Sequence, residues 1–84
     1  MIRILYFARL RERLGTDTEQ VELAPGMTDV AGLTTWLRER GGVWAETFGP
    51  VDRVLIAINQ QMASGQTPIH DGDEVAFFPP VTGG

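Results

Sequence analysis

The residues best suited to chemistry stand at the end of the chain, in the segment Pro79–Gly84. Pro79 and Pro80 favour a stiff polyproline II stem, and six extended residues reach up to about 20 Å. Gly83 and Gly84 add a tip without side chains that ends in an α-carboxylate. We interpret the segment as a slim arm that can carry a carboxylate through a narrow channel into another protein's active site. The alternative is an ordinary frayed terminus.

The remaining side chains offer little for catalysis by the chain itself. Ser64 and His70 are the single serine and the single histidine, and no nucleophile-elbow pattern surrounds the serine, which argues against a Ser–His–Asp hydrolase. The run His70–Glu74 contains residue types that bind metals. However, it lacks the ligand spacing of a calcium loop, and a lone histidine argues against zinc. With Gly72 inside it, the run instead predicts a turn.

Composition narrows the classes of function further. The chain has no cysteine, so it supplies no disulfide, thiolate nucleophile or cysteine-ligated metal. Its net charge of −4 argues against a nucleic-acid partner. All 7 basic residues are arginine, which is either a compositional bias or a way to keep amines away from an activated carboxyl group. Arg9, Arg11 and Arg13 form a solvated helix face, unless one of them docks an acidic partner.

No segment has the pattern of a membrane span or an export signal. The most apolar run, Val54–Ile58, falls far short of the roughly 20 residues that cross a bilayer. Ile4–Ala8 is too short for the apolar core of a signal peptide. We therefore expect a cytoplasmic protein without a membrane partner.

Three short elements are predicted in the first part of the chain. Ile2–Phe7 is rich in β-branched and aromatic residues and predicts a strand that is apolar on both faces toward its end. Ala8–Leu14 predicts a short helix that ends at Gly15. The alternation in Glu19–Leu23 predicts an edge or outer strand with one wet face.

The clearest helix follows a turn at Pro25-Gly26. Its apolar residues recur at three- and four-residue spacing and predict an amphipathic helix of about three turns. Thr28 or Asp29 offers its N-cap oxygen, and Gly41-Gly42 ends it. The residues with this spacing are Val30, Leu33, Trp36 and Leu37.

The second half alternates between clear and weak patterns. Val43–Arg53 has no clear period, although Trp44 and Phe48 stand at helical spacing. Val54–Ile58 is the best candidate for a central strand. The chain turns at Asn59-Gln60-Gln61, and the stretch after it, through Ile69, is weakly specified. The last strand is predicted at Glu74–Phe78, with Val75 and Phe77 on one face and Ala76 and Phe78 on the other.

This order of elements predicts one small α+β domain. A ubiquitin-like β-grasp over residues 1–78 fits best, with a mixed sheet, one main helix packed across it and a flexible C-terminal tail at 79–84. A ferredoxin-like sandwich is the alternative. If Phe77 faces the helix, Phe78 points the other way, where it forms a docking patch with Met62 unless a second layer covers it.

Four segments of the chain resemble one known family. Asp71–Gly84 is similar to the C-terminal signature of the small subunit of molybdopterin synthase. Ile4–Ala8, Arg11-Glu12 and Ala57–Gln60 resemble the same family at matching positions. The resemblance therefore spans the chain, although Val43–Arg53 resembles the family only loosely.

The resemblance implies a ubiquitin-like sulfur carrier. An adenylating enzyme of the ubiquitin-activating type would use ATP to convert the Gly84 carboxylate to an acyl-adenylate, and sulfur transfer would then replace AMP to leave a thiocarboxylate. The carrier would insert its tail into the large synthase subunit and give its sulfur to a pyranopterin precursor. Two deliveries would build the dithiolene that later holds molybdenum. The catalytic groups would lie on the partner, and this chain would bind no cofactor or metal.

The resemblance also implies roles for single residues. Gly84 would be the modified residue, Gly83 its slim neighbour, and the synthase a heterotetramer. At the position of Met62 the family often carries leucine, so this departure preserves an apolar contact. The partner contacts would be Phe78, Pro79, Pro80, Val81, Thr82 and Met62, with Arg11 a further candidate. The alternatives are a carrier for thiamine, thiouridine or cysteine synthesis, or a ubiquitin-like interaction module whose terminus is never activated.

Overall fold

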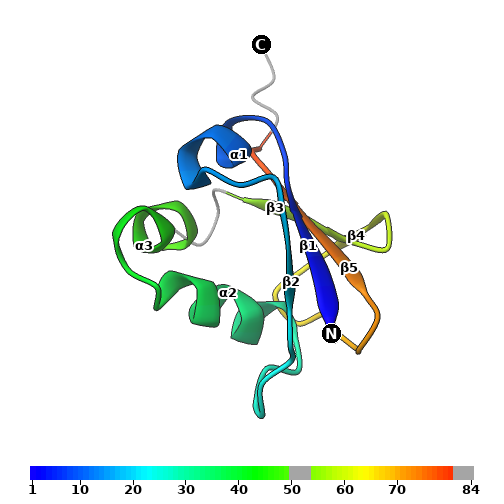
Figure 1. Ribbon diagram of the computed structural model, residues 1–84. Helices are drawn as coiled ribbons and strands as arrows, with labels where there is room; N and C mark the ends of the chain where they lie inside the picture. Colours follow the sequence, from blue (N-terminus) through cyan, green and yellow to red (C-terminus); the bar gives the residue numbers. More distant parts are fainter. Residues whose placement is uncertain (50–53, 81–84) are drawn as a thin grey trace.

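A computed structural model describes residues 1–49 and 54–80 of the chain. Its core is a five-stranded mixed sheet in the order β2-β1-β5-β3-β4. Helices α2 and α3 lie along one face of this sheet, and α1 lies at the end where β1 finishes (Figure 1). The elements are β1 (Ile2–Tyr6), α1 (Arg9–Leu14), β2 (Thr18–Val21), α2 (Val30–Arg38), α3 (Gly42–Phe48), β3 (Leu55–Ile58), β4 (Gln61–Ala63) and β5 (Glu74–Phe78).

The pairing of the strands confirms the predicted ubiquitin-like β-grasp. β1 and β5 run parallel at the centre, with Ile4 opposite Val75 and Tyr6 opposite Phe77. β2 pairs antiparallel to β1, and β3 pairs antiparallel to both β5 and β4. A parallel central pair needs a long crossover, and the helices between β1 and β5 supply it on one face of the sheet.

The hydrophobic core lies between α2 and the sheet face that the helices cover. Leu33 and Leu37 project from the helix and are fully buried, as are Val75 and Phe77 from β5. The helix begins where the Asp29 carboxylate accepts a hydrogen bond from the Gly32 N–H at 2.8 Å, so Asp29 is the cap of the two predicted candidates, Thr28 and Asp29. Alternation along β5 therefore turns one set of side chains to the helix and leaves the other on the opposite face.

The first predicted elements are confirmed with small shifts in their ends. α1 ends at Gly15, which adopts the left-handed conformation expected of a helix-terminating glycine. β2 is the edge strand that its alternation predicted, and it begins one residue earlier and ends two earlier than Glu19–Leu23.

The segment without a clear period contains a helix, α3. Trp44 and Phe48 stack at 6.2 Å between ring centroids, and Phe48 meets Phe77 edge-to-face at 5.1 Å. The helical spacing of these two aromatics was the available signal, but Gly49-Pro50 directly after Phe48 interrupts the pattern and masked it. The end of that segment, residues 50–53, lies outside the described residues.

The second half of the sheet differs from the prediction in two details. β3 is paired on both sides, but the central position of the five strands belongs to β5. β4 was not predicted; it forms because Asn59 and Gln60 adopt positive φ and close a two-residue hairpin loop. After β5, Pro79 and Pro80 follow outside any strand. The predictions for Val81, Thr82, Gly83 and Gly84 lie outside the described residues.

Candidate functional site

The sheet face turned away from α2 and α3 carries a continuous set of apolar side chains. Strand register places Leu5, Ala76, Ala57 and Met62 in one row, because each is paired directly with the next across four strands. Phe78 and Leu55 form a pair in the adjacent row. We call this surface the apolar face, and it comprises Leu5, Phe7, Leu55, Ala57, Met62, Ala76 and Phe78.

The largest exposed side chains of the apolar face lie at its two sides. Phe7 is 47% exposed and Met62 is 65% exposed. Met62 lies two strands from β5, about 10 Å at ordinary strand spacing. Phe78 is half-buried, so neighbouring side chains cover part of its ring. No segment of the described residues forms a second layer over this face, which leaves it available to another protein.

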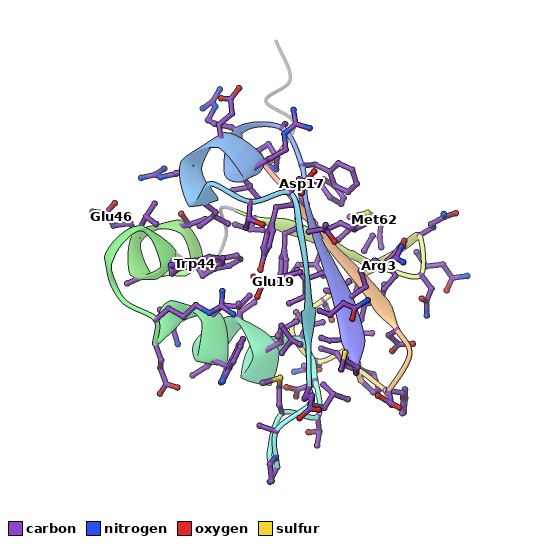
Figure 2. All side chains as sticks on the ribbon, viewed as in Figure 1. Arg3, Asp17, Glu19, Trp44, Glu46 and Met62 are labelled. Atoms are coloured by element: carbon purple, nitrogen blue, oxygen red, sulfur yellow. The ribbon has the colours of Figure 1, made fainter. Side chains whose placement is uncertain are left out.

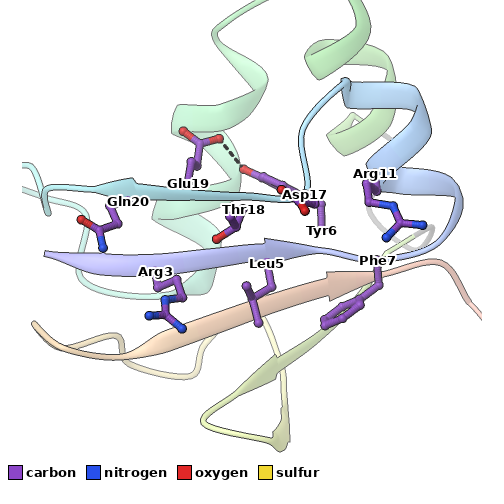
Figure 3. Close-up of a pocket in the computed structure, with 9 residues that line it drawn as sticks. All are labelled: Arg3, Leu5, Tyr6, Phe7, Arg11, Asp17, Thr18, Glu19 and Gln20. Atoms are coloured by element: carbon purple, nitrogen blue, oxygen red, sulfur yellow. Dashed lines mark hydrogen bonds between the residues drawn. The ribbon is translucent and has the colours of Figure 1, made fainter.

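A shallow hollow of about 470 Å³ extends the apolar face over β1 and β2. Figure 3 shows Arg3, Leu5 and Phe7 projecting from the β1 segment on the side away from Tyr6 and Glu19. Leu5 and Phe7 form the apolar part of the hollow, with Arg3 toward one end and Arg11 toward the other. The hollow therefore combines an apolar floor with a charged rim of both signs, because the Asp17 and Glu19 carboxylates line it as well as the two arginines.

The base of the tail stands beside this hollow. The Phe7 N–H donates to the Phe77 carbonyl oxygen at 3.0 Å, so β1 and β5 stay paired up to the last residues of both. Phe78 ends β5, Pro79 is half-buried and Pro80 is exposed. The chain thus leaves the sheet at the edge of the apolar face, next to Phe7.

Of the three arginines on α1, Arg13 pairs with Glu46 at 3.6 Å. Within the described residues neither Arg9 nor Arg11 has a carboxylate within 4.0 Å. Arg11 lines the hollow beside Phe7, which places this predicted contact residue next to the apolar face.

The acidic run His70–Glu74 forms the predicted turn. The Asp73 carboxylate accepts hydrogen bonds from the His70 backbone N–H at 2.8 Å and from the Asn59 amide at 2.9 Å. These bonds hold the pKa of Asp73 below its usual range. The Ser64 hydroxyl lies 3.4 Å from the Thr67 hydroxyl. The observed contacts of these residues are those of loop closure.

A second polar cluster joins β2 to the helices. Arg40 donates two hydrogen bonds to the Glu19 carboxylate, at 2.9 and 3.0 Å, and Tyr6 donates a third at 2.8 Å. The Arg40 guanidinium also lies over the rings of Trp36 and Trp44, 4.6 and 4.4 Å from their centroids. Figure 2 shows Trp44 and Glu19 in the space between the helices and the sheet. We call these residues the Arg40 clasp.

The clasp shifts the protonation of its members. Burial, followed by the hydrogen bond to Glu19, raises the pKa of Tyr6. Burial alone would raise the pKa of Glu19, but hydrogen bonds from Arg40 and Tyr6 outweigh it and lower that pKa. Tyr6 also stacks on Phe77, with ring centroids 6.0 Å apart. The clasp therefore also stabilises the packing between β1 and β5 on the sheet face that the helices cover.

The main residue that sequence reasoning missed is Phe7. The strand prediction noted apolar residues on both faces toward the end of Ile2–Phe7, which was the available signal. This signal alone could not place Phe7 beside the tail. The order of the strands was also needed, because only the pairing of β1 with β5 brings Phe7 to the same edge as Phe78. The structure therefore widens the predicted patch from two residues to a face that crosses four strands.

Among the described residues, no group of three histidine, cysteine, aspartate or glutamate side chains is arranged to hold a metal ion. Within the same residues, no helix has the length and apolar character needed to cross a bilayer.

Comparison with known proteins adds independent information. A family model described as the ThiS family matches residues 4–84. The chain is 43% identical to the molybdopterin synthase sulfur carrier subunit of Escherichia coli (strain K12), with 100% of both chains covered. The crystal structure of SAMP1 from Haloferax volcanii has a TM-score of 0.78 at 28% identity, covering 99% of this chain and 98% of that one. A putative molybdopterin converting factor subunit 1 from Pyrococcus furiosus has a TM-score of 0.73 at 32% identity, covering 95% and 97%.

Proposed function

The chain belongs to the ThiS family, and we propose that it is the sulfur carrier subunit of a molybdopterin synthase. The observation that carries this proposal is the full-length identity of 43% to the Escherichia coli protein of that name. The match to the ThiS family is compatible with several sulfur-carrier pathways. The resemblance at Asp71–Gly84 and the named relatives favour molybdopterin synthesis.

The reactive group in this proposal is the carboxylate of Gly84. A carboxylate is a poor electrophile, so an adenylating enzyme first joins it to the α-phosphate of ATP and releases pyrophosphate. A sulfur nucleophile then attacks the acyl carbon, the bond to AMP breaks, and a thiocarboxylate remains. Gly83 keeps the approach to that carbon free of a side chain. ATP, the sulfur source and the catalytic side chains all belong to partner enzymes.

The apolar face supports a role in docking. Exposed Phe7 and Met62 offer apolar area on either side of the base of the tail. Arg11 offers a cation at the rim. The partner that this surface suits is the large synthase subunit, bound so that the tail from Pro79 onward enters its active site. Pairs of the two subunits would assemble into a heterotetramer in the cytoplasm.

Two other assignments compete with this one. A carrier for thiamine, thiouridine or cysteine synthesis would also be loaded with sulfur, but would not deliver it to a pyranopterin. An interaction module with an inert terminus would not be loaded at all.

Intact-mass measurement separates these assignments. The full chain, incubated with its adenylating enzyme, ATP and a sulfur source, is expected to gain the mass of one oxygen-to-sulfur exchange at Gly84. An unchanged mass, where a known carrier is converted, would contradict sulfur carriage. Loading without transfer to the pyranopterin precursor, in the presence of the large subunit, would instead point to another pathway.

Docking is tested with charges placed on opposite faces of one strand. Met62→Glu puts a carboxylate on the apolar face, and Gln61→Glu puts the same group on the other face of β4. We expect the first variant to weaken binding to the large subunit by at least about tenfold, because the charge loses water at the interface. The second should bind as the wild type does. Equal affinities for the two variants would contradict docking through this face.

A further inference from the structure

The turn from β1 into α1 contains an alanine in a backbone conformation that normally belongs to glycine. Ala8 has φ 53° and ψ −127°. The Leu10 N–H donates to the Phe7 carbonyl oxygen at 3.1 Å and closes a β-turn with Ala8 at its second position. These are the angles of a type II′ turn, whose second position favours glycine because a Cβ is crowded there. The junction is therefore strained.

Contacts of the residues before and after Ala8 hold the strained turn in place. Phe7 is tied to β5 through the Phe77 carbonyl oxygen at 3.0 Å. Leu10 is buried in the core at 6% exposure, and the Arg11 N–H donates to the Ala8 carbonyl oxygen at 3.1 Å. A glycine would satisfy all these contacts without strain, since none of them uses a side chain at position 8.

The Ala8 side chain does not offset this strain by packing inside the protein, because the residue is exposed. Its immediate neighbours are the ones that a partner would meet. Phe7 precedes it on the apolar face, and Arg11 lies one turn further along at the rim of the hollow. Strained residues that the fold itself does not require are concentrated at functional sites.

We propose that the Ala8 methyl group is a contact point of the docking surface, which continues from the apolar face across the β1–α1 junction to Arg11. The occupant is the same large-subunit partner, so this inference rests on the proposed function. When the partner binds, it buries the exposed methyl group. This burial is the benefit of keeping alanine at position 8 in spite of the backbone strain, because a glycine there would have no methyl group to bury. Phe7, Ala8 and Arg11 together form one edge of the interface beside the base of the tail.

Two variants of position 8 test the proposal. Ala8→Gly removes the methyl group and the strain. A chemically synthesised chain with D-alanine at position 8 removes the strain but points its methyl group in a different direction. Both are expected to melt about 4–8 °C higher than the wild type. Both are also expected to bind the large subunit about fourfold more weakly, the effect of one buried methyl group.

Gln60→Gly is the matched control. Gln60 is also exposed and has φ 70°, but it lies in the hairpin loop between β3 and β4, away from the base of the tail. Its replacement by glycine should leave affinity unchanged. Wild-type affinity in either position-8 variant would overturn the proposal. If Ala8 were strained but made no contact with the partner, relieving the strain would cause no loss of affinity. Failure of the wild-type chain itself to bind the large subunit would instead overturn the proposed function.

Discussion

The Arg40 clasp predicts a large and specific loss of stability when its cation is removed. Arg40 stands between α2 and α3 and reaches across to Glu19 on β2, so it connects the helix layer to an edge strand. The side chains of Arg40 and Glu19 are 28% and 23% exposed, so the pair is only partly shielded from solvent. Arg40→Met keeps an apolar chain beside Trp36 and Trp44 but removes the charge and both hydrogen bonds to Glu19.

The size of the effect follows from the contacts. Each of the two cation–π contacts contributes about 0.5–1 kcal/mol. The two-point pair with Glu19 is partly screened by solvent and contributes about 1 kcal/mol. The variant should therefore lose about 2–3 kcal/mol of unfolding free energy. In a domain of this size that loss lowers Tm by roughly 10–20 °C.

Urea unfolding at neutral pH measures this difference, and Arg13→Met provides the control. Arg13 carries the same charge but pairs with Glu46 on the surface at 3.6 Å, with the two side chains 50% and 69% exposed. Its replacement should cost less than about 0.5 kcal/mol. Arg40→Lys, which retains the charge without the planar fork, should fall between the two. Equal losses in Arg40→Met and Arg13→Met would refute the energetic role of the clasp.

The same pair predicts a pH dependence. Glu19 has a lowered pKa in the folded protein, so its contribution is present above the unfolded value of 4.5 and is lost as pH falls through the folded value. The gap in stability between wild type and Arg40→Met should therefore narrow in acid. A gap that stays constant from neutral pH to strongly acidic pH would contradict the assignment of the lowered pKa to Arg40.

Three further predictions concern other parts of the molecule. Deleting Gly84 should abolish sulfur loading, measured by intact mass, while Tm stays within about 2 °C, since a terminal residue beyond the last strand adds little to the fold; a larger fall in Tm would mean that the tail is packed. Asp29→Ala should cost about 1 kcal/mol in urea unfolding, because the Gly32 N–H loses its cap; no loss would contradict the cap. Above pH ~10 the wild type should lose stability more steeply than Tyr6→Phe, because the raised pKa keeps Tyr6 protonated only in the folded state; parallel pH profiles would contradict this.

The spacing of apolar residues within a single segment was sufficient to predict α2 and β5. The spacing of Val30, Leu33 and Leu37, with Asp29 before them, predicted α2 and its cap, and both are confirmed. The alternation in Glu74–Phe78 predicted β5 and the faces of its side chains. In each case the side chains that define the element also bury it, so the sequence pattern and the packing agree.

The elements that were missed depend on partners distant in sequence. α3 begins at a glycine and is stabilised by the edge-to-face contact of Phe48 with Phe77, which no local window contains. β4 has three residues and exists because the hairpin at Asn59 returns it to β3. Phe7 became a site residue only when the parallel pairing of β1 with β5 was known. Tertiary contacts thus decided what local propensity left open.

One strand determines both the core and the start of the tail. β5 is paired on both sides, with Phe77 opposite Tyr6 in β1 and opposite Ile56 in β3. A shift of β5 by one residue in its pairing register would turn Phe77 to the apolar face and Phe78 to the core. It would also move the base of the tail by about 3.3 Å. Phe77 is fully buried, so that shift would remove a large aromatic side chain from the core. The burial of Phe77 therefore fixes where Pro79 leaves the sheet, and with it the point from which a terminal carboxylate would reach a partner's active site.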